Sequence, residues 1–104
     1  MPSKNEQLQT LKDSGVVAVI RSDRSDELVR VVQAISEGGI RAIEITMTTP
    51  GALDVIKTCV AKFKTSVLIG AGTILDTETA RVAILAGAEY LVAPTLNPAV
   101  IELC

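Results

Sequence analysis

Histidine and tryptophan are absent from this sequence of 104 residues, which has only one tyrosine, one phenylalanine and two cysteines. Without histidine, and with Cys59 and Cys104 far apart, the usual spacing of a zinc site cannot form, and we expect no metal. Few aromatic side chains are available to stack on bases. The ten basic residues are scattered in a chain of net charge −2, so nucleic acid is not an expected partner.

Long apolar runs are also missing. No stretch approaches the roughly 20 apolar residues that a membrane-spanning helix needs. The polar N-terminal segment, residues 1–15, lacks the apolar region of a signal peptide. The two cysteines are typical of reduced structural thiols. We therefore expect a cytoplasmic protein without a membrane partner.

The sequence does contain many aliphatic residues, arranged in short runs that alternate with amphipathic segments. Hydrophobic residues make up 48% of the chain, which favours a packed α/β core. Aliphatic runs predict four strands, over residues 15–21, 42–46, 66–73 and 89–94. Each predicted strand is followed by a helical pattern.

Capping residues give the expected helix ends. Ser3 and Glu6 form a capping-box pattern for a leading helix over 4–13, within residues 1–14. The second helix should begin at Ser25, carry Leu28, Val31, Val32 and Ile35 on one face, and end at Gly38 and Gly39. The third helix should begin with Thr49 as N-cap and Pro50 at the first helical position. The fourth should be capped by Asp76 or Thr77 and end at Gly87. The last should begin at Asn97 and Pro98.

The spacing of the predicted strands is typical of repeated βα units. Their centres, near Ala18, Ile43, Ile69 and Leu91, are 25, 26 and 22 residues apart. Near-continuous aliphatic strands indicate a parallel sheet covered by helices. We expect one domain, residues 1–104, with four βα units over 15–104. Two architectures fit this pattern, a small open sheet or half of an eight-stranded barrel.

Glu44 lies in the middle of the apolar run 42–46. Because side chains alternate along a strand, Ile43 and Ile45 share one face and Glu44 faces the other side with Ala42 and Thr46. A buried carboxylate is costly unless it is compensated, and such groups are often functional. Glu44 is therefore a candidate catalytic or ligand-binding residue. The alternative is a carboxylate paired with an arginine, such as Arg21, for packing alone.

Other polar candidates lie at the carboxyl ends of the predicted strands, where parallel α/β folds bind ligands. The Arg21 guanidinium suits a carboxylate or phosphate. Thr48 closely follows the Glu44 strand, and Thr73 ends the segment 70–73, "GAGT". The glycines of this segment fit a tight turn as well as they fit a ligand-binding loop. The segment is not a dinucleotide fingerprint, because Leu75 stands where that fingerprint needs glycine. A structural turn is the favoured interpretation of Pro94.

No catalytic nucleophile is evident. The five lysines lie in predicted helices or loops, and none lies inside a strand, where desolvation could lower its pKa: Lys4, Lys12, Lys57, Lys62 and Lys64. The sequence therefore predicts a base and an anion-binding group without a Schiff-base lysine.

Four motifs in order, "VVAVIR", "EGGIRAIEITMTTP", "IGAGTIL" and "AGAEYLVAPTL", resemble the N-terminal half of the 2-keto-3-deoxy-6-phosphogluconate (KDPG) / 4-hydroxy-2-oxoglutarate aldolase family. The resemblance implies a (β/α)8 TIM barrel, here its (βα)4 half with a leading helix. It also implies a trimeric, cofactor-free class I aldolase. Such an enzyme cleaves a 2-keto-3-deoxy-6-phospho sugar acid to pyruvate and glyceraldehyde 3-phosphate through a lysine Schiff base.

The resemblance also implies residue roles. Glu44 matches the general acid/base glutamate, which relays protons through a water molecule. Thr73 matches a threonine that contacts the pyruvyl carboxylate, Arg21 an arginine of the first strand, and Pro94 a pocket-lining proline. Thr48 stands where some members carry a carboxylate-binding arginine, so that role would fall to Arg21.

The family's Schiff-base lysine and phosphate site lie on later strands than this chain contains, so we expect the chain to be inactive alone. Half a barrel exposes strand edges and an apolar interior face, so we also expect it to self-associate. The alternative function is a non-catalytic α/β binding or scaffold module.

Overall fold

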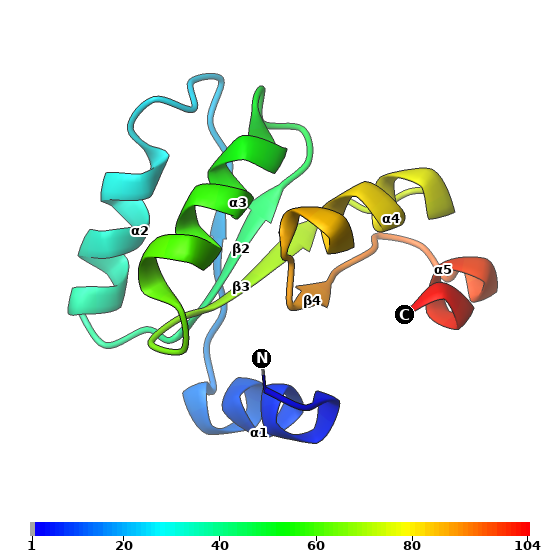
Figure 1. Cartoon of the computed structure of the whole chain (residues 1–104), viewed down its shortest axis with the longest axis horizontal. Helices are drawn as coiled ribbons and strands as arrows, with labels where there is room; N and C mark the ends of the chain where they lie inside the picture. The colour runs from blue at the N-terminus through cyan, green and yellow to red at the C-terminus, as the bar shows by residue number, and fades with distance from the viewer. Residues whose placement is uncertain (1) are drawn as a thin grey trace.

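A computed structural model describes residues 2–104 and contains a parallel sheet of four strands in the order β1-β2-β3-β4. The strands are β1 (Ala18–Ile20), β2 (Ala42–Thr46), β3 (Leu68–Gly72) and β4 (Tyr90–Leu91). The helices are α1 (Lys4–Ser14), α2 (Leu28–Glu37), α3 (Ala52–Phe63), α4 (Thr77–Ala86) and α5 (Pro98–Leu103). The predicted alternation of strand and helix is therefore confirmed, as is the half-barrel-like arrangement (Figure 1).

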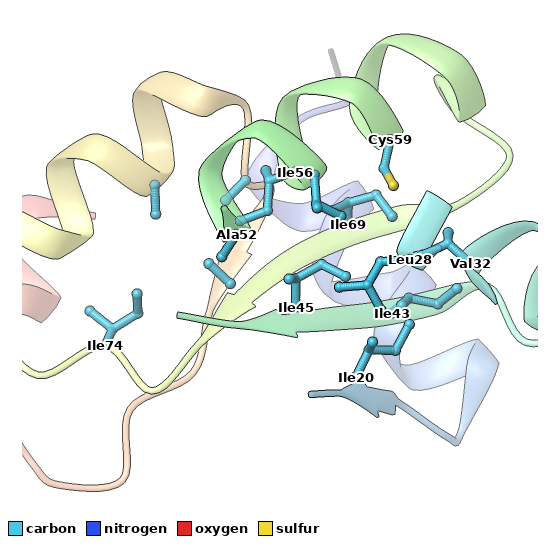
Figure 2. Packing of buried hydrophobic residues seen from close by; sticks show 14 of the residues in the cluster. Ile20, Leu28, Val32, Ile43, Ile45, Ala52, Ile56, Cys59, Ile69 and Ile74 are labelled. Carbon is cyan, nitrogen blue, oxygen red and sulfur yellow. The ribbon is translucent and has the colours of Figure 1, made fainter. Parts of the chain in front are cut away.

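The hydrophobic core lies between one face of the sheet and the helices α2, α3 and α4. Ile43, Ile45 and Ile69 are fully buried and point from the strands toward α3, where Ile56 meets them (Figure 2). The predicted alternation in β2 is thus confirmed, because Ile43 and Ile45 pack on the helices. Glu44 must then point to the other side of the sheet.

The opposite side of the sheet is named here the Glu44 face. In the register of the strands, Val19, Glu44, Gly70 and Tyr90 form one row across all four strands. Helix α1 packs against β2 and β3 and lies below their amino-terminal ends (Figure 1). Ala42 and Leu68, at the start of these strands, are buried. Val19, on the edge strand β1, is 61% exposed.

Two helix starts differ from the prediction. Helix α3 begins at Ala52 after Gly51, not with Thr49 as N-cap and Pro50 in its first turn. Thr49 O accepts a bond from Ala52 N across Pro50 and Gly51, and Gly51 has a φ of 72°. Proline followed by a glycine with positive φ is the preferred pair for a type II turn, so a turn replaces the first helical residues.

Helix α2 begins at Leu28 rather than near Ser25. Its N-cap is Glu27, without a side-chain capping bond, and Ser25 instead accepts a backbone bond from Leu28 N in a turn. Leu28 and Val32 are buried as expected and Ile35 packs against the core, but Val31 is 39% exposed. The acidic residues after Ser25 therefore belong to a loop and not to the first helical turn.

The other predicted caps are confirmed. Ser3 and Glu6 form a capping box, Asp76 and Asn97 accept bonds from the first turns of their helices, and Gly87 ends α4 with a φ of 110°. Met1, included in the expected leading segment, lies outside the described residues.

The two edge strands are shorter than predicted. Only Ala18–Ile20 and Tyr90–Leu91 form strands, although Glu89 N and Val92 N also donate backbone bonds to β3. In this structure each edge strand pairs with one neighbour, so fewer backbone bonds hold its ends extended.

Candidate active site

Glu44 is a largely buried carboxylate in the middle of the central strand β2, with an exposed fraction of 6%. Removal from water raises the pKa of its carboxyl group above the ordinary value of 4.5. Within residues 2–104 the one ion pair joins Arg24 to Asp26, so Glu44 has no arginine partner. The alternative in which Glu44 pairs with Arg21 for packing is therefore wrong for this structure.

Two glycines of β3 make room on the Glu44 face. A β-carbon at Gly72 would clash with the carboxyl end of Glu44, and one at Gly70 would clash with the ring of Tyr90. The two glycines of "GAGT" thus allow a close approach, and the approaching groups are two side chains of the same sheet. Glu44 consequently leans along the sheet from its own position toward the carboxyl end of β3.

Hydrogen bonds tie the carboxyl ends of all four strands together. Ser22 N donates to Thr49 Oγ1 at 3.2 Å and joins the loop after β1 to the loop after β2. Met47 N donates to Gly72 O at 2.9 Å, and Ile74 N donates to Val92 O at 3.1 Å. These bonds extend the sheet's side-by-side arrangement into the loops, where the other predicted site residues lie.

Each predicted substrate-binding residue lies at this edge. Arg21 directly follows β1 and Thr73 directly follows β3, while Thr48 and Pro94 occupy the loops after β2 and β4. Arg21, Thr48 and Pro94 are exposed, and Thr73 is partly buried. The Thr48 hydroxyl lies 2.9 Å from the hydroxyl of Thr46, which ends β2 on the Glu44 face. The edge therefore presents a guanidinium and several hydroxyl groups above a buried carboxyl group.

Thr73 has a strained backbone, with a φ of 60°. A β-branched residue in the left-handed region is uncommon and unfavourable, and such strain is frequent at functional sites. Glycine would relieve the strain but would remove the hydroxyl group. The conformation thus independently singles out a residue that the sequence had placed at the site.

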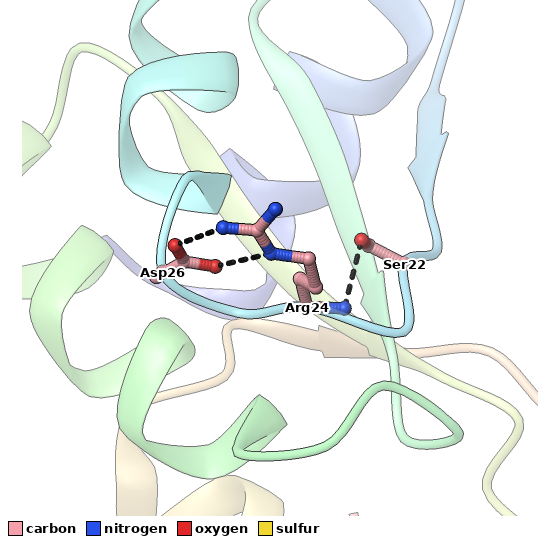
Figure 3. Close-up of polar contacts among 3 residues, drawn as sticks. All are labelled: Ser22, Arg24 and Asp26. Atoms are coloured by element: carbon pink, nitrogen blue, oxygen red, sulfur yellow. Dashed lines mark hydrogen bonds and ion pairs between the residues drawn. The ribbon is translucent and has the colours of Figure 1, made fainter.

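Arg21 and Arg24 differ in their surroundings. The Arg24 guanidinium is bound by Asp26, whose carboxylate accepts from Nε at 3.2 Å and from Nη2 at 2.7 Å (Figure 3). This bond also lowers the pKa of Asp26. Among the residues described, Arg21 makes no such pair. Arg21 is therefore the guanidinium at this edge that is available to an anion.

The lysines occupy exposed positions away from the strands. Lys4 and Lys12 belong to α1, Lys57 and Lys62 to α3, and Lys64 follows α3. The part of the chain that the structure describes contains no cluster of three metal-ligating side chains. It also has no helix long and apolar enough to cross a membrane.

The sequence did not predict the roles of Thr49, in the loop after β2, and Tyr90, on the Glu44 face. Thr49 is 3% exposed and receives the Ser22 bond, so it joins two loops instead of capping a helix. Tyr90 was assigned to a strand, but its ring lies over Gly70 on the same face as Glu44. Alternation along "EYLVAP" together with the glycine at position 70 was the signal that could have identified Tyr90.

Comparison with known proteins gives a consistent relationship. The model of the KDPG and KHG aldolase family matches residues 8–104. The 2-dehydro-3-deoxy-phosphogluconate aldolases of Treponema pallidum and Haemophilus influenzae are 35% and 32% identical to this chain. These alignments cover 92% and 93% of the chain, and 45% of each relative. A KDPG aldolase structure from Legionella pneumophila, with pyruvate captured as a covalent carbinolamine, has a TM-score of 0.84 at 25% identity.

The structural match covers 93% of this chain and 47% of the Legionella chain. The chain therefore spans about half the length of the relatives that it matches. Its fold corresponds to half of their barrel, and the family match extends over nearly the whole chain. The chain belongs to the KDPG and KHG aldolase family.

Proposed function

We propose that this chain provides the acid/base half of a class I aldolase site, which cleaves 2-keto-3-deoxy-6-phosphogluconate to pyruvate and glyceraldehyde 3-phosphate. The observation that carries the proposal is the position of Glu44, a buried carboxyl group without an ion-pair partner among residues 2–104, below the carboxyl edge of the sheet. Burial raises its pKa toward neutrality, which favours proton transfer in both directions.

The chemistry requires a second group, an amine nucleophile. A lysine amine adds to the substrate ketone and forms a carbinolamine, which loses water to give an iminium ion. The substrate carbon–carbon bond then breaks, its electron pair moves into the iminium to give an enamine, and the hydroxyl of the departing fragment loses its proton. Glu44, through a water molecule, supplies the proton for carbinolamine dehydration and accepts the proton of that hydroxyl.

We propose that the nucleophile lies outside these 104 residues. All five lysines are exposed on helices or just after one, so none is enclosed in a pocket as a Schiff-base nucleophile would be. The covalent carbinolamine of the Legionella enzyme, of which this chain matches 47%, supports an amine mechanism for that relative. The 104-residue chain by itself is then inactive as an aldolase.

The residues at the strand ends would bind the keto acid. Thr73 contributes a hydroxyl group to the pyruvyl carboxylate, Thr48 and Pro94 line the pocket, and Arg21 supplies the positive charge. In a chain extended with the second half of the Treponema relative, Arg21→Ala should raise the substrate KM. An unchanged KM would exclude this role for Arg21.

A non-catalytic module is the second candidate function, and the exposure of all five lysines favours it. In that case the edge with Arg21 and Thr73 would hold a small carboxylate or phosphate without turning it over. Binding of pyruvate to the 104-residue chain, combined with no activity in the extended chain, would support the module.

We also propose that the protein is a cytoplasmic homo-oligomer, a trimer when extended to the length of its relatives, and that the 104-residue chain self-associates. Val19 is 61% exposed on the Glu44 face, and β1 and β4 are the sheet's edges in this structure. Sedimentation equilibrium at micromolar concentration should detect dimers or larger species. Val19→Lys should weaken this association, and a monomeric wild-type chain would contradict it.

Activity of the extended chain tests the proposed function. With a coupled assay for pyruvate, the extended wild-type chain should cleave KDPG, and Glu44→Gln should lower kcat by about 10²–10⁴-fold. The matched control is Glu102→Gln, which changes an exposed glutamate of α5. Equal kcat values for wild type and Glu44→Gln would refute the catalytic role of Glu44.

A further inference from the structure

Tyr90 is the chain's single tyrosine, and it lies on the Glu44 face without a place in the chemistry above. The register pairs Glu44 with Gly70 and Gly70 with Tyr90, so Gly70 alone separates the two side chains in their row. The distal ring carbons Cε1, Cε2 and Cζ of Tyr90 are the atoms that a side chain at Gly70 would meet. The ring therefore extends from β4 across β3.

The hydroxyl group of Tyr90 must lie beyond these ring carbons. Because Oη is bonded to Cζ and the ring reaches over β3 from β4, Oη points onward toward β2, the strand of Glu44. Glu44 occupies the adjoining space over Gly72, two residues farther along the same face of β3. The phenol and the carboxyl group consequently approach the same patch of β3 from opposite sides.

The Tyr90 hydroxyl is buried, and no residue within 2–104 is hydrogen-bonded to it. A buried hydroxyl group without a partner is unusual in a folded protein. Tyrosine can donate its proton to a carboxylate or to a bridging water molecule. Burial and the charges of Glu44 and Glu89 raise the pKa of Tyr90, so the phenol keeps this proton.

Other polar groups also lie near Tyr90. Lys4 and Gln7 of α1, together with Glu89, line a groove that also includes Tyr90. The Lys4 amine lies 3.4 Å from the backbone oxygen of Cys104. The Glu89 carboxylate is directed at Ile69 N, at 3.5 Å. Glu44 is the acidic group toward which the ring extends.

We propose that Tyr90 is a positioning residue for Glu44: the Tyr90 phenol donates a hydrogen bond to a water molecule, which in turn donates one to the Glu44 carboxylate. Its ring also forms a wall that keeps the carboxylate over Gly72. The bond favours the ionised carboxylate and so opposes the effect of burial. A role of this bond in proton transfer rests on the proposed function. The existence of the bond does not depend on that function.

Titration of Glu44 by carbon-detected NMR in the 104-residue chain tests the pairing without any need for activity. Tyr90→Phe keeps the ring and removes only the donor. It should lower the acid dissociation constant of the Glu44 carboxyl group about tenfold, because the ionised form loses one hydrogen bond. The matched control is Ser66→Ala, which removes a hydroxyl group bonded to Phe63 O in the loop before β3. It should leave the titration of Glu44 unchanged.

The reciprocal measurement uses the ultraviolet absorbance of the single tyrosine. Glu44→Gln should lower the pKa of Tyr90 more than Glu89→Gln does, because the charge of Glu44 has the larger effect on the phenol. An identical Glu44 titration in wild type and Tyr90→Phe would overturn the proposal, as would a larger effect of Glu89→Gln. If the pairing is found but Glu44→Gln leaves the extended chain fully active, the proposed function fails and the pairing stands.

Discussion

The carboxyl group of Glu44 lies over Gly72 in the space that any side chain at position 72 would fill. Glu44 reaches this position from β2, and Gly72 ends β3 beside it. The absence of a side chain at Gly72 thus determines the direction in which the carboxylate leans. This relationship connects a small residue in a strand to the position of the proposed acid/base group.

Gly72→Ala should displace the Glu44 carboxylate while preserving the fold. The methyl group meets the flexible end of Glu44, which can rotate away, so circular dichroism should remain unchanged. In the extended chain, kcat should fall about 10²-fold, since misplacement by about 1 Å is sufficient for such a loss. Gly38→Ala is the control, because Gly38 has an ordinary φ of −76° at the end of α2. Unchanged kcat in Gly72→Ala would contradict the assigned position of Glu44.

The pH dependence of stability provides a second test of Glu44. Its pKa in the folded protein is raised above the ordinary value of 4.5, so folding penalises the ionised form. This penalty is fully present above the folded pKa and vanishes as pH falls below the unfolded pKa. Glu44→Gln, which has no ionised form, should therefore increase the free energy of unfolding at neutral pH.

Urea denaturation of wild type and Glu44→Gln across the acidic and neutral range measures this difference. The advantage of the variant should disappear as pH falls through the folded pKa toward 4.5 and below. Glu102→Gln, at an exposed position of α5, should show no comparable advantage. A stability difference that is the same at every pH would disprove an ionisation penalty at Glu44.

A further prediction concerns Ile69 in the hydrophobic core. This residue is fully buried between the sheet and α3, and its replacement by alanine leaves a cavity. Ile69→Ala should lower the free energy of unfolding by about 2–5 kcal/mol. Ile101→Ala, at a position that is 62% exposed, should change it by less than about 0.5 kcal/mol. Comparable losses in both variants would mean that Ile69 is not in the core.

The two cysteines should react at different rates. Cys59 is buried in α3, and burial raises the pKa of its thiol to about 11, whereas Cys104 is exposed. Iodoacetamide at neutral pH should therefore modify Cys104 first, since the thiolate is the reactive form. Mass spectrometry should find modified Cys59 only after denaturation. Equal modification of both cysteines in the folded chain would be inconsistent with this packing.

Much of the fold could be predicted because aliphatic periodicity and capping residues act locally. The alternation of Ile43, Glu44 and Ile45 predicted which side chain leaves the core, and the structure confirms it. The start of α3 could not be obtained this way, because Thr49 and Pro50 fit both a helix start and a turn. Gly51 with its positive φ, together with the Ser22 bond to Thr49, favours the turn.

The candidate site was predictable where residues follow strands, as for Arg21 and Thr73. Tyr90 was not predicted, because its relation to Glu44 depends on the register of three strands and on the absence of a side chain at Gly70. The pairing of strands that are far apart in the sequence is a property of the tertiary structure. The apolar run around Glu44 and the resemblance to a family therefore identified Glu44, but neither identified Tyr90 on the far side of Gly70.

Borohydride trapping with pyruvate, followed by intact-mass measurement, tests most directly whether this chain carries the acid/base group without the nucleophile. The 104-residue chain and the chain extended with the second half of the Treponema relative should be treated side by side. We predict one reduced pyruvyl adduct on the extended chain and none on the 104-residue chain. An adduct on the 104-residue chain would show that one of its five lysines is a nucleophile and would contradict the account.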